Sequence, residues 1–95
     1  MKRLRFSRRA ELDLIDIGDW IAKDRPRAAR RFVDGIVDRV QSLREASDMG
    51  PLYPVYGEGV RGLSFRPYVI LYRVSGDDVF IERVIHGARL PKNIT

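Results

Sequence analysis

Two strand-like segments near the end of this 95-residue chain constrain its fold more than any other feature. Tyr68–Val74 and Val79–His86 are rich in Val, Ile, Tyr and Phe, and a polar turn, SGDD at residues 75–78, separates them. This pattern predicts a β-hairpin. Nearly every position of both strands is apolar, which is typical of strands that are covered on both faces or lie in the middle of a sheet. Other parts of the chain must supply that cover.

Helical spacing predicts two helices that can cover the hairpin. Ser7 is a suitable N-cap for a helix over residues 8–23, and Asp24 can cap a second helix, with Pro26 in its first turn, over residues 26–46. The apolar stripe of the first helix contains Ala10, Leu14, Ile17, Gly18 and Ile21; Leu12, Ile15 and Trp20 widen it, and Asp13, Asp16, Asp19 and Lys23 lie outside its centre. The short connection predicts an antiparallel helical hairpin.

Two shorter strands complete the predicted fold. Residues 1–6 alternate charged and apolar side chains, Val60–Phe65 has the composition of a strand, and the glycines and prolines of Ser47–Gly59 predict an ordered loop before it. The order β-α-α-β-β-β predicts an α+β fold in which the helical hairpin packs on one side of a mostly antiparallel sheet. We expect one domain over residues 1–95, with a tail, Leu90–Thr95, too short to add an element.

The charge of the chain favours a nucleic acid or an acidic protein as its partner. The net charge is +5, and arginine, whose guanidinium group makes bidentate contacts with phosphate and carboxylate, provides 15 of the 18 basic residues. A GC-rich genome would explain the arginine content equally well. The absence of cysteine excludes disulfides and thiol catalysis, and with a single histidine we expect neither a metal nor a cofactor. Since no long apolar segment is present, we expect a soluble, cytoplasmic protein.

His86 is the one clear candidate for acid–base chemistry, because a general acid or base must titrate near neutral pH. Arg83 and Arg89 lie near it in sequence, and together they could bind and cleave a phosphodiester. A purely structural interpretation has His86 capping the strand end by hydrogen bonding and Arg83 pairing with an acid. Four arginines lie on or beside strands that could share one face: Arg61, Arg66, Arg73 and Arg83.

The aromatic residues allow two interpretations. The tyrosines at positions 53, 56, 68 and 72 are expected mainly in the core, with hydroxyl groups at its rim, and base stacking is the alternative. Trp20 is expected to be a contact between helix and sheet, and the alternative is that it forms part of a groove for a partner.

The end of the hairpin resembles the C-terminal half of ParE-type toxins in the ParE/RelE superfamily. The resemblance is carried by the sequence IERVIHGAR at residues 81–89 after a strand that ends in Tyr72-Arg73, and the order of elements matches over essentially the whole chain. It implies the toxin of a type II toxin–antitoxin system that causes growth arrest by binding and inhibiting DNA gyrase, as in plasmid stabilisation. It also implies a cognate antitoxin, ParD-like or similar, acidic and partly disordered, lying across the helical hairpin and the open sheet edge.

The RelE branch of the superfamily offers an alternative function, ribosome-dependent cleavage of mRNA. There the resemblance implies Lys and Arg groups on the central strands and a tail residue, often Tyr, but this chain has no Lys between Lys23 and Lys92 and no Tyr after Tyr72. The difference favours the ParE branch, with no catalytic residues. An inactive relative that binds only its antitoxin is a third possibility. The residues considered are Arg61, Arg66, Arg83 and His86 for catalysis, and Trp20, Arg30, Arg31, Arg61, Arg73, Arg83 and Arg89 for partner binding.

Overall fold

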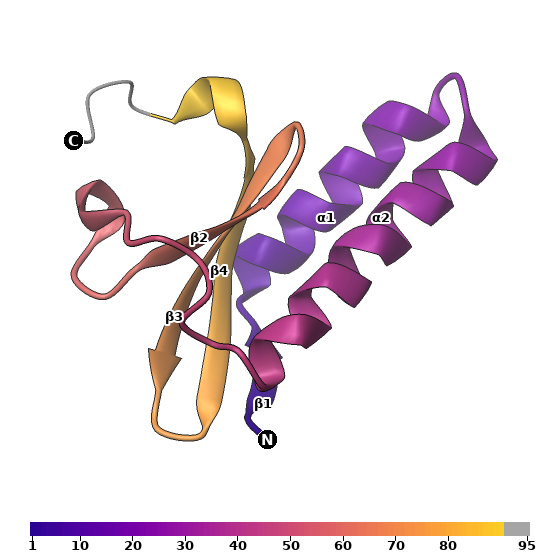
Figure 1. The fold of residues 1–95 in the computed structure, drawn as a ribbon. Coiled ribbons are helices and arrows are strands. Elements are labelled where there is room, and N and C mark those ends of the chain that lie inside the picture. The colour runs from indigo at the N-terminus through magenta and orange to yellow at the C-terminus, as the bar shows by residue number, and fades with distance from the viewer. Residues whose placement is uncertain (91–95) are drawn as a thin grey trace.

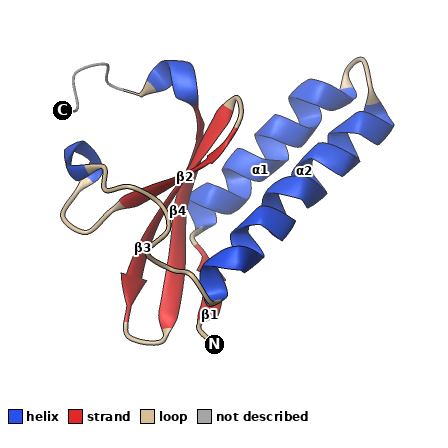
Figure 2. Ribbon diagram, in the orientation of Figure 1, coloured by secondary structure: helices blue, strands red, loops and turns tan. Residues whose placement is uncertain are grey.

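A computed structural model describes residues 1–90 as a helical hairpin packed on one face of a four-stranded sheet (Figures 1 and 2). The elements are β1 (Arg3–Phe6), α1 (Arg8–Ala22), α2 (Pro26–Gln41), β2 (Arg61–Phe65), β3 (Tyr68–Ser75) and β4 (Asp78–His86), with 3₁₀ turns at Ser42–Arg44, Pro54–Tyr56 and Gly87–Arg89. The predicted α+β fold and its order of elements are confirmed. The expectation for the tail concerns mainly residues 91–95, which lie outside the described part of the chain.

The strands follow the spatial order β1-β4-β3-β2, so the predicted hairpin forms the centre of the sheet. β3 pairs antiparallel with both β2 and β4, whereas β1 runs parallel to β4. The register between β3 and β4 shifts by one residue, because Tyr72 lies opposite Ile81 but Leu71 lies opposite Arg83. This β-bulge changes which side chains of β4 face the helices beyond Ile81.

Apolar side chains cover β3 on both faces, as the composition of the hairpin predicts. On the helix side the core contains Ala10, Ile17, Ile36, Val40, Leu43, Leu63, Ile70, Tyr72, Val79, Ile81 and Val84. On the opposite side Val60, Val69, Leu71 and Ile85 form a smaller cluster under Tyr53, Tyr56 and Leu90. The loop between α2 and β2 therefore acts as a second layer over part of the sheet (Figure 1).

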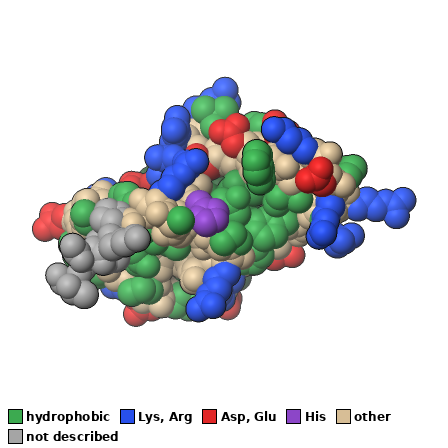
Figure 3. Space-filling view, turned by 90° about the horizontal axis from the view of Figure 1, so that it is seen from above, with side chains coloured by type: hydrophobic (Ala, Val, Ile, Leu, Met, Phe, Trp, Pro, Cys, Tyr) green, Lys and Arg blue, Asp and Glu red, His purple; other side chains and the backbone are tan. Residues whose placement is uncertain are grey.

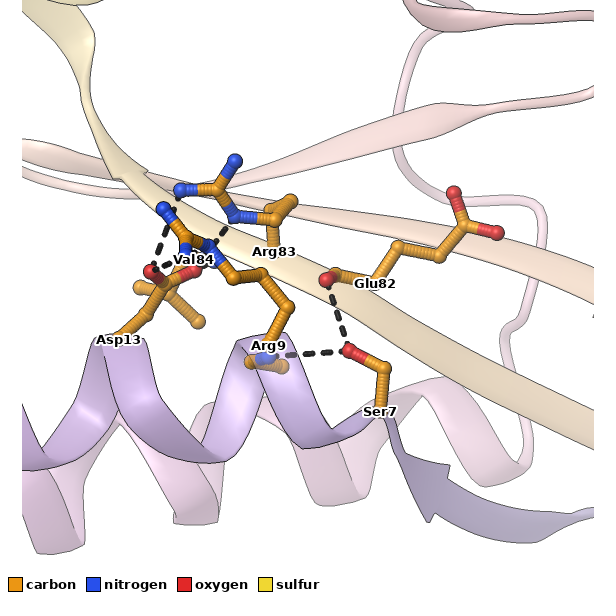
Figure 4. A network of polar contacts seen from close by, with 7 residues as sticks. Ser7, Arg9, Asp13, Glu82, Arg83 and Val84 are labelled. Carbon is orange, nitrogen blue, oxygen red and sulfur yellow. Dashed lines mark hydrogen bonds and ion pairs between the residues drawn. The ribbon is translucent and has the colours of Figure 1, made fainter.

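Ser7 connects the start of α1 to the edge of β4. Its hydroxyl oxygen accepts a hydrogen bond from the Ala10 N–H at 2.9 Å, which confirms the predicted N-cap. The same hydroxyl donates to the Glu82 carbonyl at 2.8 Å (Figure 4). The Ser7 N–H donates to the Ile81 carbonyl. One side chain thus caps the helix and continues the pairing of β4 where β1 ends.

The predicted ends of α2 need correction. Asp24 does not cap this helix: Arg25 is at the N-cap position without a side-chain hydrogen bond, and Pro26 takes the first turn. The helix ends at Gln41 instead of continuing to residue 46, and a 3₁₀ turn follows. At that point the Ser42 hydroxyl donates to the Arg39 carbonyl at 2.6 Å, a bond of the kind that competes with helical backbone pairing. Within residues 1–90 neither helix is long and apolar enough to cross a membrane.

The predicted stripe of α1 also differs from the buried face. Ile15 and Trp20 are 55% and 68% exposed, whereas Asp13 is only 8% exposed. The buried residues Ala10, Asp13 and Ile17 are three and four positions apart, so they lie on one side of the helix. Ile15 lies on the other side, together with exposed Glu11 and Asp19.

The four tyrosines lie in or at the edge of the two cores, which confirms their predicted core role. Tyr72 is fully buried, and its hydroxyl donates to the Ser47 carbonyl at 2.8 Å and accepts from the Gly50 N–H at 3.0 Å. Burial raises the pKa of this hydroxyl above its ordinary value. Tyr72 therefore fastens the loop after α2 to the centre of the sheet.

Tyr72→Phe should lower the free energy of unfolding by about 1 to 3 kcal/mol, because the buried Gly50 N–H and the partly buried Ser47 carbonyl lose their partner. The pKa of the Tyr72 hydroxyl is higher in the folded chain than its ordinary value of about 10 in the unfolded chain. The resulting contribution to stability is fully present below about pH 10 and is lost as the pH rises through the folded pKa. Urea unfolding at pH 7 and at increasing alkaline pH measures both effects. Tyr53→Phe is the matched control, and equal stability loss in the two variants would contradict the role of the Tyr72 hydroxyl.

Candidate partner-binding groove

An open groove of about 600 Å³ lies between α1 and the C-terminal end of β4. α1 contributes Asp16, Ile17 and Trp20 to its lining, and the end of β4 with the turn that follows contributes Val84, His86 and Arg89. Figure 3 shows hydrophobic side chains gathered on this face beside the histidine, with basic side chains around the margin. An apolar floor with a charged margin is the usual composition of a site that binds a peptide or protein segment.

Trp20 forms one wall of the groove and is not part of the core. Its side chain is 68% exposed, and the Lys23 ammonium group lies 4.9 Å from the centre of its ring. A cation at this distance is attracted by the face of the indole. The expected contact between helix and sheet is therefore wrong for Trp20. The indole lines the groove, and its contact with a partner stays a prediction.

A row of aromatic contacts holds the other wall. The rings of Tyr68 and His86 meet edge to face at 5.4 Å, and Phe32 of α2 contacts Tyr68 at 5.7 Å and Phe65 at 5.3 Å. Such edge-to-face pairs are favoured by the charge distribution of the rings. They join α2, β2, β3 and β4 at the end of the sheet where the groove opens, so this wall is ordered before any partner binds.

His86 has the structural role that the sequence allows. Its Nδ1 atom accepts a hydrogen bond from the Ala88 N–H at 3.1 Å and so caps the final 3₁₀ turn. The imidazole is otherwise exposed on the groove. The interpretation of His86 as a strand-end cap is confirmed, and the position of the ring also brings it to the same groove as Trp20 and Arg89.

Arg83 is paired with an acid, as its structural interpretation predicts. Its Nε atom donates to Asp13 Oδ2 at 2.8 Å and a terminal nitrogen donates to Asp13 Oδ1 at 3.2 Å. The Val84 N–H donates to the same Oδ2 at 2.9 Å, and Arg9 lies 4.0 Å from Oδ1 (Figure 4). Hydrogen bonding to Asp13 raises the pKa of the Arg83 guanidinium above its ordinary value. The carboxylate of Asp13 is thus the centre of a network between α1 and β4.

Asp13 and Tyr68 are residues of this site that the sequence interpretation missed. The position of Asp13, three residues after Ala10 and four before Ile17, is a signal that it faces inward. The place of Tyr68 beside His86 has no such signal, because it depends on the register shift within the hairpin.

Arg61 and Arg73 do not share one face of the sheet, contrary to expectation. Arg61 lies opposite Tyr72, the neighbour of Arg73 on β3, and successive residues of a strand point to opposite faces. A terminal nitrogen of Arg61 donates to the Gly50 carbonyl at 2.8 Å, so this arginine holds the loop after α2. Arg73 pairs with Glu82 at 2.9 Å on the face away from the helices.

The other arginines predicted to bind partners or act in catalysis are exposed at three separate places. Arg66 lies in the turn between β2 and β3, Arg30 and Arg31 lie on the solvent side of α2, and Arg89 lies at the groove. Of the residues predicted to bind partners or act in catalysis, the structure brings only Trp20, His86 and Arg89 to the same groove.

A family model described as "ParE toxin of type II toxin-antitoxin system, parDE" matches residues 4–91. This chain belongs to the ParE toxin family. The identification confirms the resemblance carried by residues 81–89, and it places the chain among the toxins of type II toxin–antitoxin systems.

Curated relatives and a solved structure agree with membership in the ParE family. "Toxin RelE3" of Caulobacter vibrioides is 33% identical over 92% of this chain and 96% of its own length. "Putative toxin Y4kP" of Sinorhizobium fredii is 40% identical over 90% of this chain and 88% of its own length. A solved structure titled "Chromosomal ParDE TA system from P. aeruginosa" superposes with a TM-score of 0.79 at 30% identity, covering 90% of this chain and 96% of that chain.

Proposed function

We propose that this ParE-family toxin acts by binding DNA gyrase and inhibiting it, without catalysis. The observation that carries the proposal is the engagement of Arg83, the arginine of the central strands nearest in sequence to His86. Asp13 holds the Arg83 guanidinium through two of its nitrogens. Arg61 is held by loop carbonyls elsewhere. A nuclease site would need such groups to converge on one phosphodiester.

The choice of gyrase as target rests on the family. The chain belongs to the ParE family, and its resemblance to ParE-type toxins implies inhibition of gyrase by binding. The groove supports a binding mechanism, since its apolar floor and exposed Trp20 are suited to protein contacts.

The proposal includes a cognate antitoxin with an acidic, partly disordered segment that folds along the toxin. The related solved structure is titled as a ParDE TA system. The groove offers Ile17, Val84 and Trp20 to apolar side chains of such a segment, and exposed Arg89 to its carboxylates. Arg30 and Arg31 provide further exposed positive charge on α2.

The deciding experiment induces this chain alone in cells and follows plasmid supercoiling, DNA-damage signalling and the integrity of mRNA. We expect altered DNA topology or DNA breaks while messages stay intact. Purified chain should then inhibit supercoiling by gyrase in vitro, and added antitoxin should restore it. Unchanged topology, with or without growth arrest, would contradict the proposal, and absence of any growth arrest would point to an inactive relative.

One observation favours mRNA cleavage as the second candidate. His86 is exposed beside Arg89 on the groove, so a histidine and an arginine could meet one phosphodiester. His86→Ala separates the two functions. We expect the variant to keep its effect on DNA topology, because the hydrogen bond to the Ala88 N–H and the ring contact with Tyr68 are both structural contacts of His86. Loss of toxicity in a variant with an unchanged melting temperature, together with mRNA cleavage by the unmodified chain, would establish the second candidate.

A further inference from the structure

The face of the sheet away from the helices carries an exposed aromatic side chain, Phe80 of β4. Its neighbours Val79 and Ile81 are fully buried in the helix-side core, so alternation along the strand directs Phe80 to the opposite face. The side chain is 36% exposed. The small cluster under the loop after α2 covers other parts of this face, at Val69, Leu71 and Ile85.

The strand register places an arginine on each side of Phe80. Arg5 of β1 and Arg73 of β3 both lie directly opposite it in the ladder. Cross-strand partners have Cβ atoms about 5 Å apart on the same face. The Arg5 and Arg73 side chains are 56% and 41% exposed, so the three side chains form a row across three strands that a ligand can reach.

The charge around Phe80 is positive. Arg3 and Arg5 project from β1 on this face, and their Nε atoms lie 2.9 Å and 3.5 Å from the same oxygen, Asp78 Oδ1. Arg73 pairs with Glu82. Three guanidinium groups on this face therefore pair with only two carboxylates, which leaves one positive charge in excess. Residues 1–9 as a whole contain five basic side chains and no acid, which extends the positive field from β1 toward the start of α1.

We propose that this face binds single-stranded nucleic acid, with a base stacked on Phe80 and the adjacent phosphates contacted by Arg3 and Arg5. Aromatic side chains on an open sheet flanked by arginine are suited to this ligand, because every base has a face for stacking and the phosphates supply the negative charge. A duplex keeps its bases stacked within the helix and cannot offer them. The site lies on the other side of the sheet from the core under the helices, and it does not depend on the choice of gyrase as target.

Fluorescence anisotropy of a labelled dT12 oligonucleotide, titrated with the full chain at several salt concentrations, tests this surface. We expect Phe80→Ala to weaken binding about tenfold, within the range that loss of one stacked base produces. We expect Arg5→Gln to weaken it and to reduce the slope of log affinity against log salt by about 0.7. Arg31→Gln removes the same charge from exposed α2 and is the matched control. U12 in place of dT12 shows whether DNA or RNA is preferred.

Phe80→Leu guards against a change in folding, since it keeps apolar cover on the sheet and removes only the aromatic ring. It should retain the melting temperature and still lose most of the affinity. Binding of dT12 that is absent, or equal in the Phe80 variants and the unmodified chain, would overturn the proposal. The proposal would also be overturned if a 12-base-pair duplex bound as tightly as dT12, or if a poly-glutamate peptide competed as well as unlabelled dT12. Equal losses of affinity in Arg31→Gln and Arg5→Gln would overturn it too. Each of these results indicates charge attraction without stacking.

Discussion

Asp13→Ala should lower the free energy of unfolding by about 2 to 4 kcal/mol, the largest loss of stability expected for a single polar side chain of this protein. The substitution leaves the buried Val84 N–H without its acceptor and the Arg83 guanidinium without its partner. An orphaned buried donor costs about 1 to 3 kcal/mol, and hydrogen bonds to charged groups are worth about 1.5 to 3 kcal/mol. The Arg83 side chain is 33% exposed, so water recovers part of that loss and keeps the total below a simple sum.

Thermal and urea unfolding of the purified chain measure this effect. A loss of this size lowers the melting temperature of a domain of about 100 residues by at least about 8 °C. Asp16→Asn removes a carboxylate of the neighbouring, exposed position and should change stability by no more than about 0.5 kcal/mol. In a chain that already carries Arg83→Met, Asp13→Ala should lower the free energy of unfolding by less than it does in the unmodified chain, because the ionic part of the interaction is already absent. Equal losses in the Asp13 and Asp16 variants would contradict the role assigned to Asp13.

Trp20→Ala should weaken binding of the cognate antitoxin by at least about 30-fold, which corresponds to the roughly 2 kcal/mol of an interface hot spot. The reason is that Trp20 lines the apolar groove while 68% of its surface still contacts water, so a partner can bury most of it. Because the indole is this exposed, it contributes little to the folded state, and Trp20→Ala should change the free energy of unfolding by no more than about 0.5 kcal/mol.

Titration calorimetry or competition binding with the purified antitoxin checks this expectation. Ile15→Ala is the matched control, because Ile15 is a large apolar residue on the same helix, 55% exposed, and outside the groove. We expect it to change the affinity less than threefold. Similar losses in the two variants would mean that the antitoxin covers the whole exposed side of α1, and an unchanged affinity for Trp20→Ala would place its binding site elsewhere.

Local patterns predict the elements of this fold because each depends on residues close together in the chain. The spacing of Ala29, Ile36 and Val40 identifies α2, and the two apolar runs around residues 75–78 identify the β3–β4 hairpin. Predictions that depend on one side chain are weaker. Trp20 has the apolar character of the stripe of α1 but lies exposed on the groove. Asp13 lacks that character and is buried, because β4 supplies partners for its carboxylate.

The position of His86 shows why the groove cannot be found from sequence. Regular alternation along β4 from Val79 and Ile81 would direct His86 away from the helices. The register shift between Tyr72 and Leu71 reverses the alternation, so Val84 joins the helix-side core and His86 contacts Tyr68 beside the groove. A bulge adds one residue to a strand without a clear composition signal.

Beyond the end of β1, Ser7 and Asp13 take up the hydrogen-bonding groups on the edge of β4, and this has a consequence for aggregation. An exposed strand edge is a template on which another chain can add a strand, and this is a common route to aggregation. Here Ser7 takes the carbonyls of Ile81 and Glu82, and Asp13 takes the Val84 N–H, so this stretch of edge has few groups left to offer an incoming strand. The toxin is thereby protected from self-association at this edge by Ser7, through its N–H and hydroxyl, and by the Asp13 carboxylate. Loss of Asp13 would expose the edge as well as weaken the fold.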